Sequence, residues 1–463
     1  MTIRLRAFIS IPLWLLFLEW PALAITNVAR PKNDLEQEAR AGNNTDTNPT
    51  NSNASPNNAN SNSDSGNSIS NSNAARLPTT INRKSNSDKN FPTDAYLRKQ
   101  VRFWEIVFQK YPSTSVIVHD AEEPDRLVDL IDYELFAKRD GKTVGTRDDR
   151  AKTTQKYLDR YTIALDRFAK LGKDALRFGA IEKRVWSVYS RSPEALTRLY
   201  KGEVKLRTQT GLSDTFLEAT LKAQTYRPYM ESVFRSYVIP AKLTRLVFVE
   251  SMFNLDAVSK VGASGIWQFM PATGRRFLSV ERHVDERNNP WKATRAAALY
   301  LLDGYREMGS WPLAITGYNH GRGGLHKAIR ETGTRDFGYI AKNYRGHKSF
   351  GFASRNYYGE FLAAVSTYDW LFRTGKIDLT PVSNREVTFI LPRSLTVGDI
   401  MAASRLDEQT LMRLNPCLTA KAFSQYRNKP LPKNYEIRIP IEKSDQFKIA
   451  IKRKTNRDTV ARR

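Results

Sequence analysis

The chain is poor in the residues that build covalent and metal-dependent scaffolds. Among its 463 residues there is one cysteine, Cys417, so a disulfide within the chain is excluded and packing must stabilise the fold. Histidine is scarce too, and its five positions match no metal-ligand spacing. We therefore expect neither a bound metal ion nor another cofactor. The histidines are His119, His283, His320, His326 and His347.

Negative charge is also in short supply. The chain has 48 acidic residues against 73 Lys and Arg residues, which gives a formal net charge of +25. This excess favours an anionic partner, either nucleic acid, an anionic membrane surface or a wall polymer that bears carboxylates. A generally solvated basic surface accounts for part of the excess, and we expect residues 448–463 to form a charged, frayed end.

Long apolar runs are missing beyond the start of the chain. There, Arg4 and Arg6 precede an apolar run over residues 7–18 and an Ala-x-Ala site that ends at Ala24. This order predicts a signal peptide over residues 1–24, with no cysteine at the cleavage site to carry a lipid. An uncleaved anchor is disfavoured because a bilayer span needs roughly 20 apolar residues. Export disfavours nucleic acid, so a wall or membrane surface is the expected anionic partner.

Composition divides the N-terminal half of the chain. Residues 25–89 are rich in Asn and Ser and have no apolar period, which predicts a disordered tether. Residues 90–212 show helical apolar patterns around one predicted strand at residues 114–118. We expect a turn at His119 and Asp120, directly after that strand.

The C-terminal half contains two further regions. Residues 213–376 form a helical block rich in aromatic residues, in which Pro228 and Pro240 are each expected to open a helix. Residues 381–442 predict a small β-α-α-β module, and residues 443–463 form a basic tail. The elements predicted in the module are residues 387–391, 397–404, 407–414 and 435–439.

A carboxyl group falls on the apolar face of the helix predicted after Pro240. Leu243, Leu246 and Val247 lie at positions i, i+3 and i+4 of that face, and Glu250 lies at i+7. Burial and a place near the helix C-terminus would both raise the pKa of this side chain, so that it could act as a general acid near neutral pH. The alternative is a glutamate that points outward at a frayed helix end.

The segment after Glu250 favours the buried acid. Residues 251–271 are polar and interrupted by glycines, which allow close backbone approach to a ligand. Ser259 and Gln268 offer hydrogen bonds, and Trp267 and Phe269 offer flat apolar faces of the kind on which sugar rings stack. The segment therefore predicts a glycan site beside Glu250.

Three segments share their order and spacing with a known family. They are residues 250–271 (ESMFNLDAVSKVGASGIWQFMP), residues 316–321 with the pattern Tyr-Asn-x-Gly, and residues 355–357 with the pattern Arg-Asn-Tyr. Together they resemble the lytic transglycosylases with a goose-type-lysozyme-like domain, most closely the membrane-bound type D branch. The resemblance covers residues 101–440. It implies a mainly α, lysozyme-like catalytic domain of the α+β superfamily at residues 213–376, with a helical N-terminal extension.

The resemblance also implies a role for each matching position. Glu250 would be the catalytic acid and base, Ser259 would position the substrate's N-acetyl group or the catalytic carboxyl, and Tyr318 and Asn319 would face the scissile bond. The implied substrate contacts are Ser259, Gly265, Gln268, Met270, Tyr318, Asn319 and Tyr357. The sequence departs from the family at Ala353, where a glutamate is usual, and at Ser354, where a threonine is usual.

The C-terminal module resembles a degenerate LysM domain, a glycan-binding fold. Residues 411–416 match its helix-end motif and residues 437–440 its last strand, while its usual start is reduced to Gly398-Asp-Ile. The alternative is a plain structural cap on the catalytic domain.

The implied activity is cleavage of the MurNAc-GlcNAc β-1,4 bond of peptidoglycan in the periplasm or cell envelope, leaving 1,6-anhydro-MurNAc ends. Most glycosidases use two carboxylates, yet Asp256, Asp285 and Asp303 lie in no motif that would pair them with Glu250. A lysozyme-like hydrolase and a non-catalytic wall-binding protein stay open as alternatives. A serine hydrolase based on Ser264 is excluded because Ile266 stands where the nucleophile elbow needs glycine.

Overall fold

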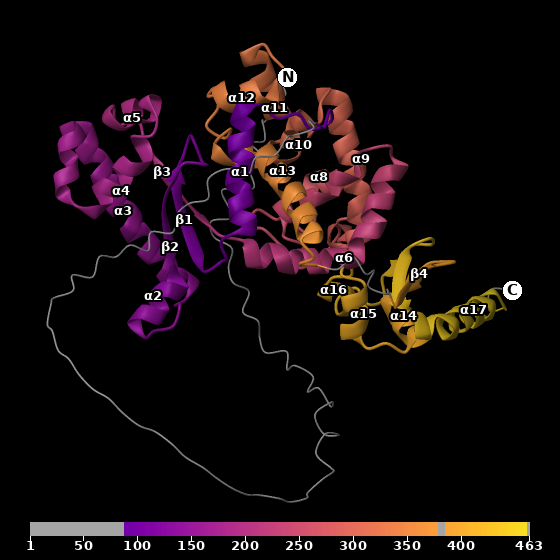
Figure 1. The fold of residues 1–463 in the computed structure, drawn as a ribbon. Coiled ribbons are helices and arrows are strands. Elements are labelled where there is room, and N and C mark those ends of the chain that lie inside the picture. The colour runs from indigo at the N-terminus through magenta and orange to yellow at the C-terminus, as the bar shows by residue number, and fades with distance from the viewer. Residues whose placement is uncertain (1–87, 378–384, 461–463) are drawn as a thin grey trace, which may run out of the picture. The chain divides into compact units, whose positions relative to one another are not determined.

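The computed structural model describes residues 88–377 and 385–460, all of which belong to one compact unit (Figure 1). The predicted signal peptide and residues 25–87 of the predicted tether lie outside these ranges. Within the described ranges, no helix combines the length and the apolar character that crossing a membrane requires.

The first helix belongs to the same core as the catalytic block. Helix α1 (Ala95–Gln109) begins at Asp94, whose side chain accepts a hydrogen bond from the backbone N–H of Leu97. Its buried face carries Phe103, Trp104, Val107 and Phe108, and the helix runs beside α13 (Phe352–Arg373), as Figure 1 shows in indigo and orange. The start of the predicted N-terminal extension is therefore part of the main hydrophobic core.

A three-stranded antiparallel sheet follows α1. Its strands are β1 (Ser115–Asp120), β2 (Leu127–Asp132) and β3 (Leu206–Thr210), in the order β2-β1-β3. The predicted turn at His119 and Asp120 is wrong, because both residues pair with β3. Side chains alternate across the sheet, so that Ile117 enters the main core while Val116 and Val118 enter a second core.

Four helices surround the second core. Helix α3 begins with a capping box between Thr146 and Asp149, and its buried residues Tyr161, Leu165 and Phe168 pack against the neighbouring helices. The helices are α2 (Tyr133–Asp140), α3 (Arg147–Leu171), α4 (Ala180–Tyr189) and α5 (Pro193–Tyr200), with the 3-10 segment η2 (Gly172–Phe178) between α3 and α4.

The main core is helical, as predicted, but Pro228 does not open a helix. It lies inside α6 (Ser213–Ser236), where the apolar face from Phe216 to Phe234 continues on both sides of the proline and packs in the core. Pro240 does precede a helical turn, η3 (Ala241–Arg245), which leads into α7. The remaining elements are α7 (Leu246–Glu250), α8 (Pro271–Gly274), η4 (Glu286–Asn288), α9 (Pro290–Met308), α10 (Trp311–His320), α11 (Arg322–Thr332), α12 (Phe337–Asn343) and α13.

The C-terminal module contains the predicted order of strand, two helices and strand. Strand β4 (Glu386–Ile390) pairs antiparallel with β7 (Glu436–Pro440), and α14 (Val397–Ser404) and α15 (Glu408–Leu414) lie between them in sequence. Smaller elements complete the module, namely β5 (Leu395–Thr396), α16 (Ala420–Phe423), β6 (Pro430–Leu431) and η5 (Ile441–Lys443).

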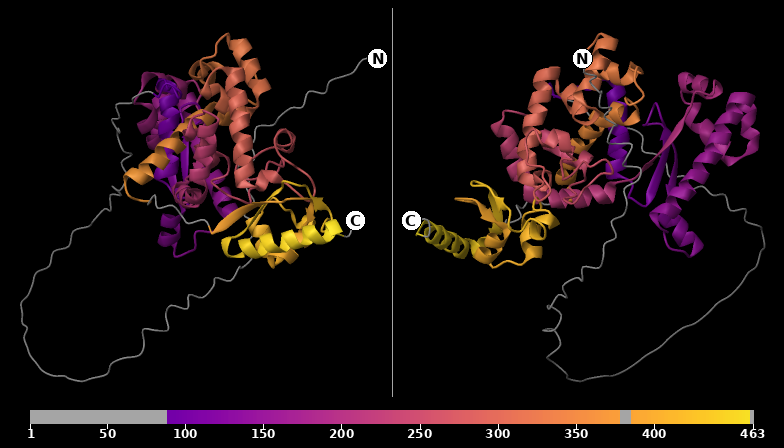
Figure 2. Two further views of the ribbon diagram at one scale, coloured as in Figure 1. Left: turned by 90° about the vertical axis from the view of Figure 1, so that its right-hand side faces the viewer. Right: turned by 180° about the vertical axis from the view of Figure 1, so that it is seen from behind.

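The expectation of a frayed C-terminal end is wrong over most of its length. Helix α17 (Ser444–Val460), drawn in yellow in Figure 2, follows η5. Its Phe447 and Ile451 are buried in the core of the module, so apolar packing holds the first half of the helix despite its many basic residues.

Candidate active site

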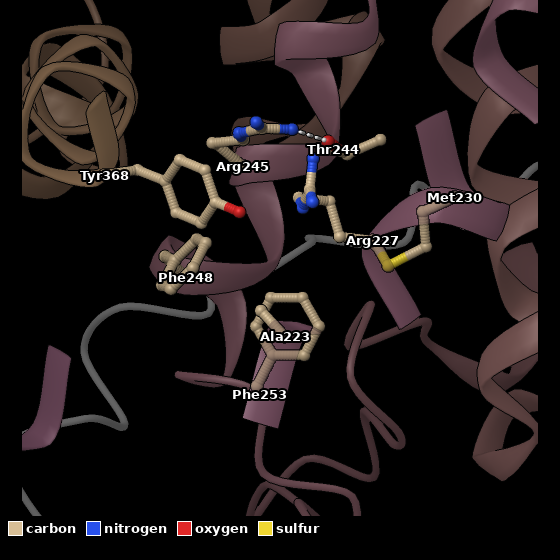
Figure 3. A pocket seen from close by; sticks show the side chains of 8 residues that line it. All are labelled: Ala223, Arg227, Met230, Thr244, Arg245, Phe248, Phe253 and Tyr368. Atoms are coloured by element: carbon tan, nitrogen blue, oxygen red, sulfur yellow. Dashed lines mark hydrogen bonds between the residues drawn. The ribbon is translucent and has the colours of Figure 1, made fainter. Parts of the chain in front are cut away.

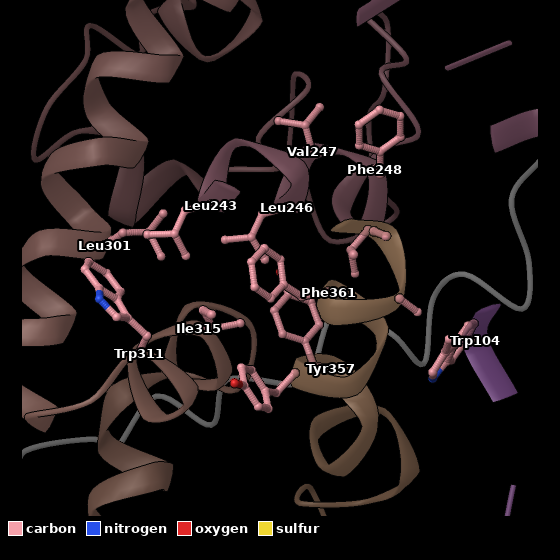
Figure 4. Close-up of a cluster of buried hydrophobic side chains, with 14 of the residues drawn as sticks. Trp104, Leu243, Leu246, Val247, Phe248, Leu301, Trp311, Ile315, Tyr357 and Phe361 are labelled. Atoms are coloured by element: carbon pink, nitrogen blue, oxygen red, sulfur yellow. The ribbon is translucent and has the colours of Figure 1, made fainter. Parts of the chain in front are cut away.

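Glu250 is the last residue of α7 and points into the core. Glu250 is 3% exposed, and every other residue of α7 is buried as well, as is Leu243 in the preceding 3-10 turn (Figure 4). Burial raises the pKa of Glu250 to about 8, although a hydrogen bond from Tyr357 lowers it in part. The alternative of an outward glutamate is therefore wrong, and Glu250 is a neutral acid at neutral pH.

Tyr357 on α13 holds the Glu250 carboxyl. Its hydroxyl donates a hydrogen bond to Oε1 of Glu250, and its ring is fully buried in the main core. Burial, followed by the charge of Glu250, raises the pKa of Tyr357 well above its usual value, so the phenol stays a donor. The sequence predicted Tyr357 as a substrate contact, whereas the structure gives it direct contact with the acid.

A second buried carboxyl lies one helical turn beyond Tyr357. Glu360 is 2% exposed, and burial raises its pKa well above the usual range, with a further contribution from the charge of Glu250. Residues three apart share a helix face, which places Glu360 on the side of α13 that carries Tyr357. Sequence reasoning missed this residue, although the i, i+3 spacing from the final motif is a usable signal.

The loop after α7 is fixed by Arg287. Arg287 Nη1 donates to the backbone oxygens of Gly262 at 2.6 Å and Phe269 at 2.9 Å, and Arg287 pairs with Asp285 at 2.6 Å. Gly265 has φ +76°, and a Cβ there would lie 1.9 Å from the backbone oxygen of Arg287. The predicted close approach at Gly265 is thus to the chain itself.

Gln268 and Ser259 hold the same loop from inside. Gln268 Nε2 donates to the backbone oxygens of Ala257 at 3.1 Å and Gly265 at 2.9 Å. Ser259 Oγ accepts from the backbone N–H of Ala263 at 2.9 Å. Their amide and hydroxyl groups therefore shape the loop, and Met270, half-buried, follows it immediately before α8.

Trp267 and Phe269 do not offer the predicted stacking faces. Trp267 is 0% and Phe269 is 2% exposed. Trp267 stacks on Phe234 with 5.7 Å between ring centroids, and its Nε1 donates to Thr294 Oγ1 at 3.0 Å. Both rings are core residues because the Gly-rich loop folds back onto α6 and α9.

Helix α10 brings Tyr318 and Asn319 to the site. Tyr318 Oη donates to the backbone oxygen of Trp267 at 2.8 Å, and burial, followed by the charge of Glu250, raises the pKa of Tyr318 well above its usual value. Neither amide atom of Asn319 has a hydrogen-bond partner among the described residues, although both atoms are buried. A buried unpaired amide costs stability, so Asn319 is a candidate for contact with a ligand.

Ser354, at the start of α13, has a side-chain hydroxyl like the threonine that is usual at this position. Its Oγ lies 2.9 Å from Nδ1 of His320 on α10, and burial is the main cause that lowers the pKa of His320 to about 4. The neutral imidazole thus bridges α10 and α13 through a serine at the position where threonine is usual.

A pocket beside α7 does not contain Glu250 (Figure 3). Arg245 closes one side of it, over the ring of Tyr368 at 4.2 Å and paired with Glu231 at 2.5 Å. The lining residues are Ala223, Arg227, Met230, Thr244, Arg245, Phe248, Phe253 and Tyr368, none of which is a predicted site residue. Across the described ranges, no three His, Cys, Asp or Glu side chains gather in a way that could hold a metal ion.

Curated proteins and solved structures show similarity to parts of this chain. The chain is 35% identical over 133 residues to the membrane-bound lytic murein transglycosylase D of Escherichia coli K12, which is 28% of each chain. It is 31% identical over 110 residues to a putative tributyltin chloride resistance protein of an Alteromonas species, covering 23% of this chain and 53% of that one. The chain thus spans between about a quarter and a half of the curated relatives it matches.

Two crystal structures of lytic transglycosylases are also similar. The 70 kDa soluble enzyme of Escherichia coli has a TM-score of 0.27 and 16% identity, over 52% of this chain and 45% of that one. An inactive mutant of Slt from Pseudomonas aeruginosa has a TM-score of 0.28 and 15% identity, over 59% and 43%. Residues 232–340 match the family described as Transglycosylase SLT domain. The predicted resemblance to lytic transglycosylases is therefore confirmed, and the chain carries a transglycosylase SLT domain that includes Glu250, Tyr318 and Asn319.

Proposed function

We propose that the chain is a peptidoglycan lytic transglycosylase that cleaves the MurNAc-GlcNAc β-1,4 bond, with Glu250 as acid and then base. The carrying observation is the neutral, buried carboxyl of Glu250 at the end of α7, bound to Tyr357 and lying in an SLT domain. A carboxyl whose pKa lies near the working pH suits both proton donation and proton removal. The similarity to the membrane-bound lytic murein transglycosylase D of Escherichia coli supports murein as the substrate class.

The first step uses the protonated form of Glu250. Its proton passes to the glycosidic oxygen, the bond from C1 to that oxygen breaks, and the substrate's own N-acetyl group stabilises C1. Glu250 is then a buried carboxylate. The hydroxyl of Tyr357 donates to this carboxylate and supplies the hydrogen bond that lowers its pKa.

The second step regenerates the acid. The Glu250 carboxylate takes the proton of the C6 hydroxyl, and the C6 oxygen bonds to C1 to close a 1,6-anhydro ring. No water is consumed, and each proton that Glu250 gives in the first step returns in the second. A single carboxyl is therefore sufficient for the whole cycle.

The buried state of Glu360 argues against the hydrolytic alternative. A hydrolase needs a second, ionised carboxylate to activate water or to attack C1. Glu360 shares the helix face of Tyr357, and burial raises its pKa well above the usual range, which disfavours the ionised form that a hydrolase would use. This direction supports ring closure over attack by water.

We further propose that the enzyme acts on glycan strands in the periplasm or at the cell envelope, and that residues 381–442 bind glycan as a LysM-like module. The antiparallel pairing of β4 with β7 around two helices supports the module's assignment. Pull-down of Glu250→Gln by insoluble peptidoglycan, compared with the same variant lacking residues 381–463, tests it. Unchanged binding without the module would favour a structural cap.

Product analysis tests the proposed activity. The mature chain, Glu250→Gln and Glu307→Gln are incubated with purified peptidoglycan, and soluble products are identified by mass spectrometry. Glu307 is a matched control because it pairs with Arg322 at 2.9 Å on the surface of the same domain. We expect anhydro-muramyl products from the mature chain and the control, and none from Glu250→Gln. Binding without products from any of the three would indicate a wall-binding protein.

A further inference from the structure

Arg355 of the final motif is held by a carboxylate from a distant part of the chain. Arg355 Nη1 lies 2.9 Å from Glu122 Oε2, and Nη2 lies 3.3 Å from Glu122 Oε1, so the guanidinium fork meets both oxygens. Arg345 Nη2 reaches Glu122 Oε2 at 2.9 Å. Burial raises the pKa of Glu122, but the two arginines outweigh it and hold the pKa below its usual value.

Glu122 supplies a carboxylate beside Arg355 that the first turn of α13 lacks. The family motif usually has a glutamate two residues before the arginine, and this chain has Ala353 there. Glu122 lies 233 positions earlier, in the turn between β1 and β2. The motif around Arg355 therefore could not predict its pairing with Glu122.

Hydrogen bonds to Asp120 hold the turn that carries Glu122. Asp120 Oδ1 accepts hydrogen bonds from the backbone N–H groups of Glu122 at 2.8 Å and Glu123 at 3.2 Å. Asp120 is itself fully buried and held by Tyr189 Oη at 2.9 Å and Arg198 Nη2 at 3.1 Å. The second core thus holds the backbone of the turn from which the Glu122 side chain reaches Arg355.

The sheet also contacts the first turn of α13 through Phe352. The ring of Phe352 lies 5.6 Å from the ring of His119 on β1, and the guanidinium of Arg207 on β3 lies over it at 4.6 Å. Phe352 and Arg355 both precede Tyr357 on the same helix. The contacts of the sheet therefore set the position from which the Tyr357 hydroxyl reaches Glu250.

We propose that Glu122 is a positioning residue of the active site, which acts through Arg355 and the first turn of α13 to keep Tyr357 on Glu250. The N-terminal sheet then contributes to catalysis by positioning α13. This inference rests on the proposed lytic transglycosylase function.

Steady-state kinetics on soluble glycan strands test the inference with the full mature chain. Glu122→Gln keeps the shape of the side chain and removes its charge. We expect kcat to fall roughly tenfold with KM little changed, because a small displacement of a catalytic contact costs rate more than binding. We also expect the basic limb of the pH profile to move upward, because the Tyr357 hydrogen bond lowers the pKa of Glu250.

Two comparisons separate positioning from general stability. Glu123→Gln is the matched control, because Glu123 sits in the same turn but pairs with Lys99, Arg126 and Arg198 rather than with Arg355, and its kinetics should match the parent. Glu122→Gln combined with Tyr357→Phe should be no slower than Tyr357→Phe alone, because the contact that Glu122 positions is already lost.

The outcomes distinguish the inference from the function on which it rests. If the parent cleaves glycan and Glu122→Gln matches it in kcat and pH profile, or if its loss adds fully to that of Tyr357→Phe, the inference is wrong and the proposed function stands. If activity falls only in step with a lowered Tm, the role is structural and the inference is also wrong. If the parent yields no cleavage product, the proposed function fails and the inference fails with it.

Discussion

The hydroxyl of Tyr357 donates a hydrogen bond to Oε1 of Glu250, across 107 positions of sequence and inside the main hydrophobic core. α7 and α13 each deliver one of the two groups, and the buried environment keeps the carboxyl neutral while the phenol remains a donor. In the proposed mechanism, this pair carries the proton transfer.

Cleavage should decline as the pH rises through about 8. Burial raises the pKa of Glu250 to about 8, and only the protonated form can donate to the glycosidic oxygen. We expect the basic limb of kcat/KM against pH to lie near that value. A basic limb near pH 5, close to the range in which an ordinary carboxyl ionises, would contradict a buried Glu250 as the acid.

Stability should fall over a related pH range. The folded-state pKa of Glu250 is raised, so its contribution to stability is complete below the unfolded pKa of about 4.3 and is lost as the pH rises to about 8. Glu250→Gln removes this dependence. We expect the variant to exceed the parent in unfolding free energy by on the order of 5 kcal/mol at pH 9 and to match it at pH 4, as measured by urea titration. Equal curves at both values would contradict a buried, ionisable Glu250.

Removing one hydroxyl should slow the reaction. Tyr357→Phe deletes the donor to Glu250, so kcat should fall roughly 10- to 100-fold with KM unchanged. Tyr358→Phe is the matched control, because the adjacent hydroxyl donates to the backbone oxygen of Pro92 at 3.0 Å instead. Equal rates for the two variants would show that the contact with Glu250 has no part in catalysis.

Neutralising the second carboxyl should preserve the reaction. Burial raises the pKa of Glu360 well above its usual range and so favours the neutral carboxyl, which Glu360→Gln resembles in charge and shape, and we expect activity within about threefold of the parent. The products should stay anhydro-muramyl. A loss as large as that of Glu250→Gln would make Glu360 a required base and favour hydrolysis.

The loop after α7 should tolerate no side chain at Gly265. A Cβ would meet the Arg287 backbone oxygen at 1.9 Å, and φ is +76°, so Gly265→Ala should cost about 3 kcal/mol or more of unfolding free energy. Gly323→Ala on α11 is the control, since no atom lies within 4 Å of the added Cβ. Chemical denaturation measures both. A small effect at Gly265 would mean that the loop moves easily.

The spacing of apolar residues before Glu250 predicted its burial but could not predict which side chains contact it. The spacing of Leu243, Leu246, Val247 and Glu250 predicted a buried Glu250. The structure confirms this burial, but Leu243 lies in a 3-10 turn and all of α7 is buried rather than one face of it. The contact with Tyr357 joins residues from two elements that meet only in the folded chain, so the sequence showed both residues without their relation.

The errors share a physical cause in long-range packing. β3 pairs with β1 about 90 positions away, and its residues after Leu206 are all polar. The sequence pattern therefore did not predict a strand there or the pairing that extends β1 to Asp120. Core contacts on both sides of Pro228 outweigh the helix-breaking tendency of proline. We predicted that Trp267 and Phe269 stack on sugar rings because nothing in the sequence shows how the loop folds onto α6 and buries them.

Cleavage in water enriched in heavy oxygen tests the central claim most directly. The mature chain and Glu250→Gln are incubated with peptidoglycan in this water, and the new saccharide ends are examined by mass spectrometry. If Glu250 alone drives ring closure, the parent yields anhydro-muramyl ends without heavy oxygen and the variant yields none. Reducing ends that carry the heavy isotope would show that water attacks C1, and would contradict a transglycosylase with a single carboxyl.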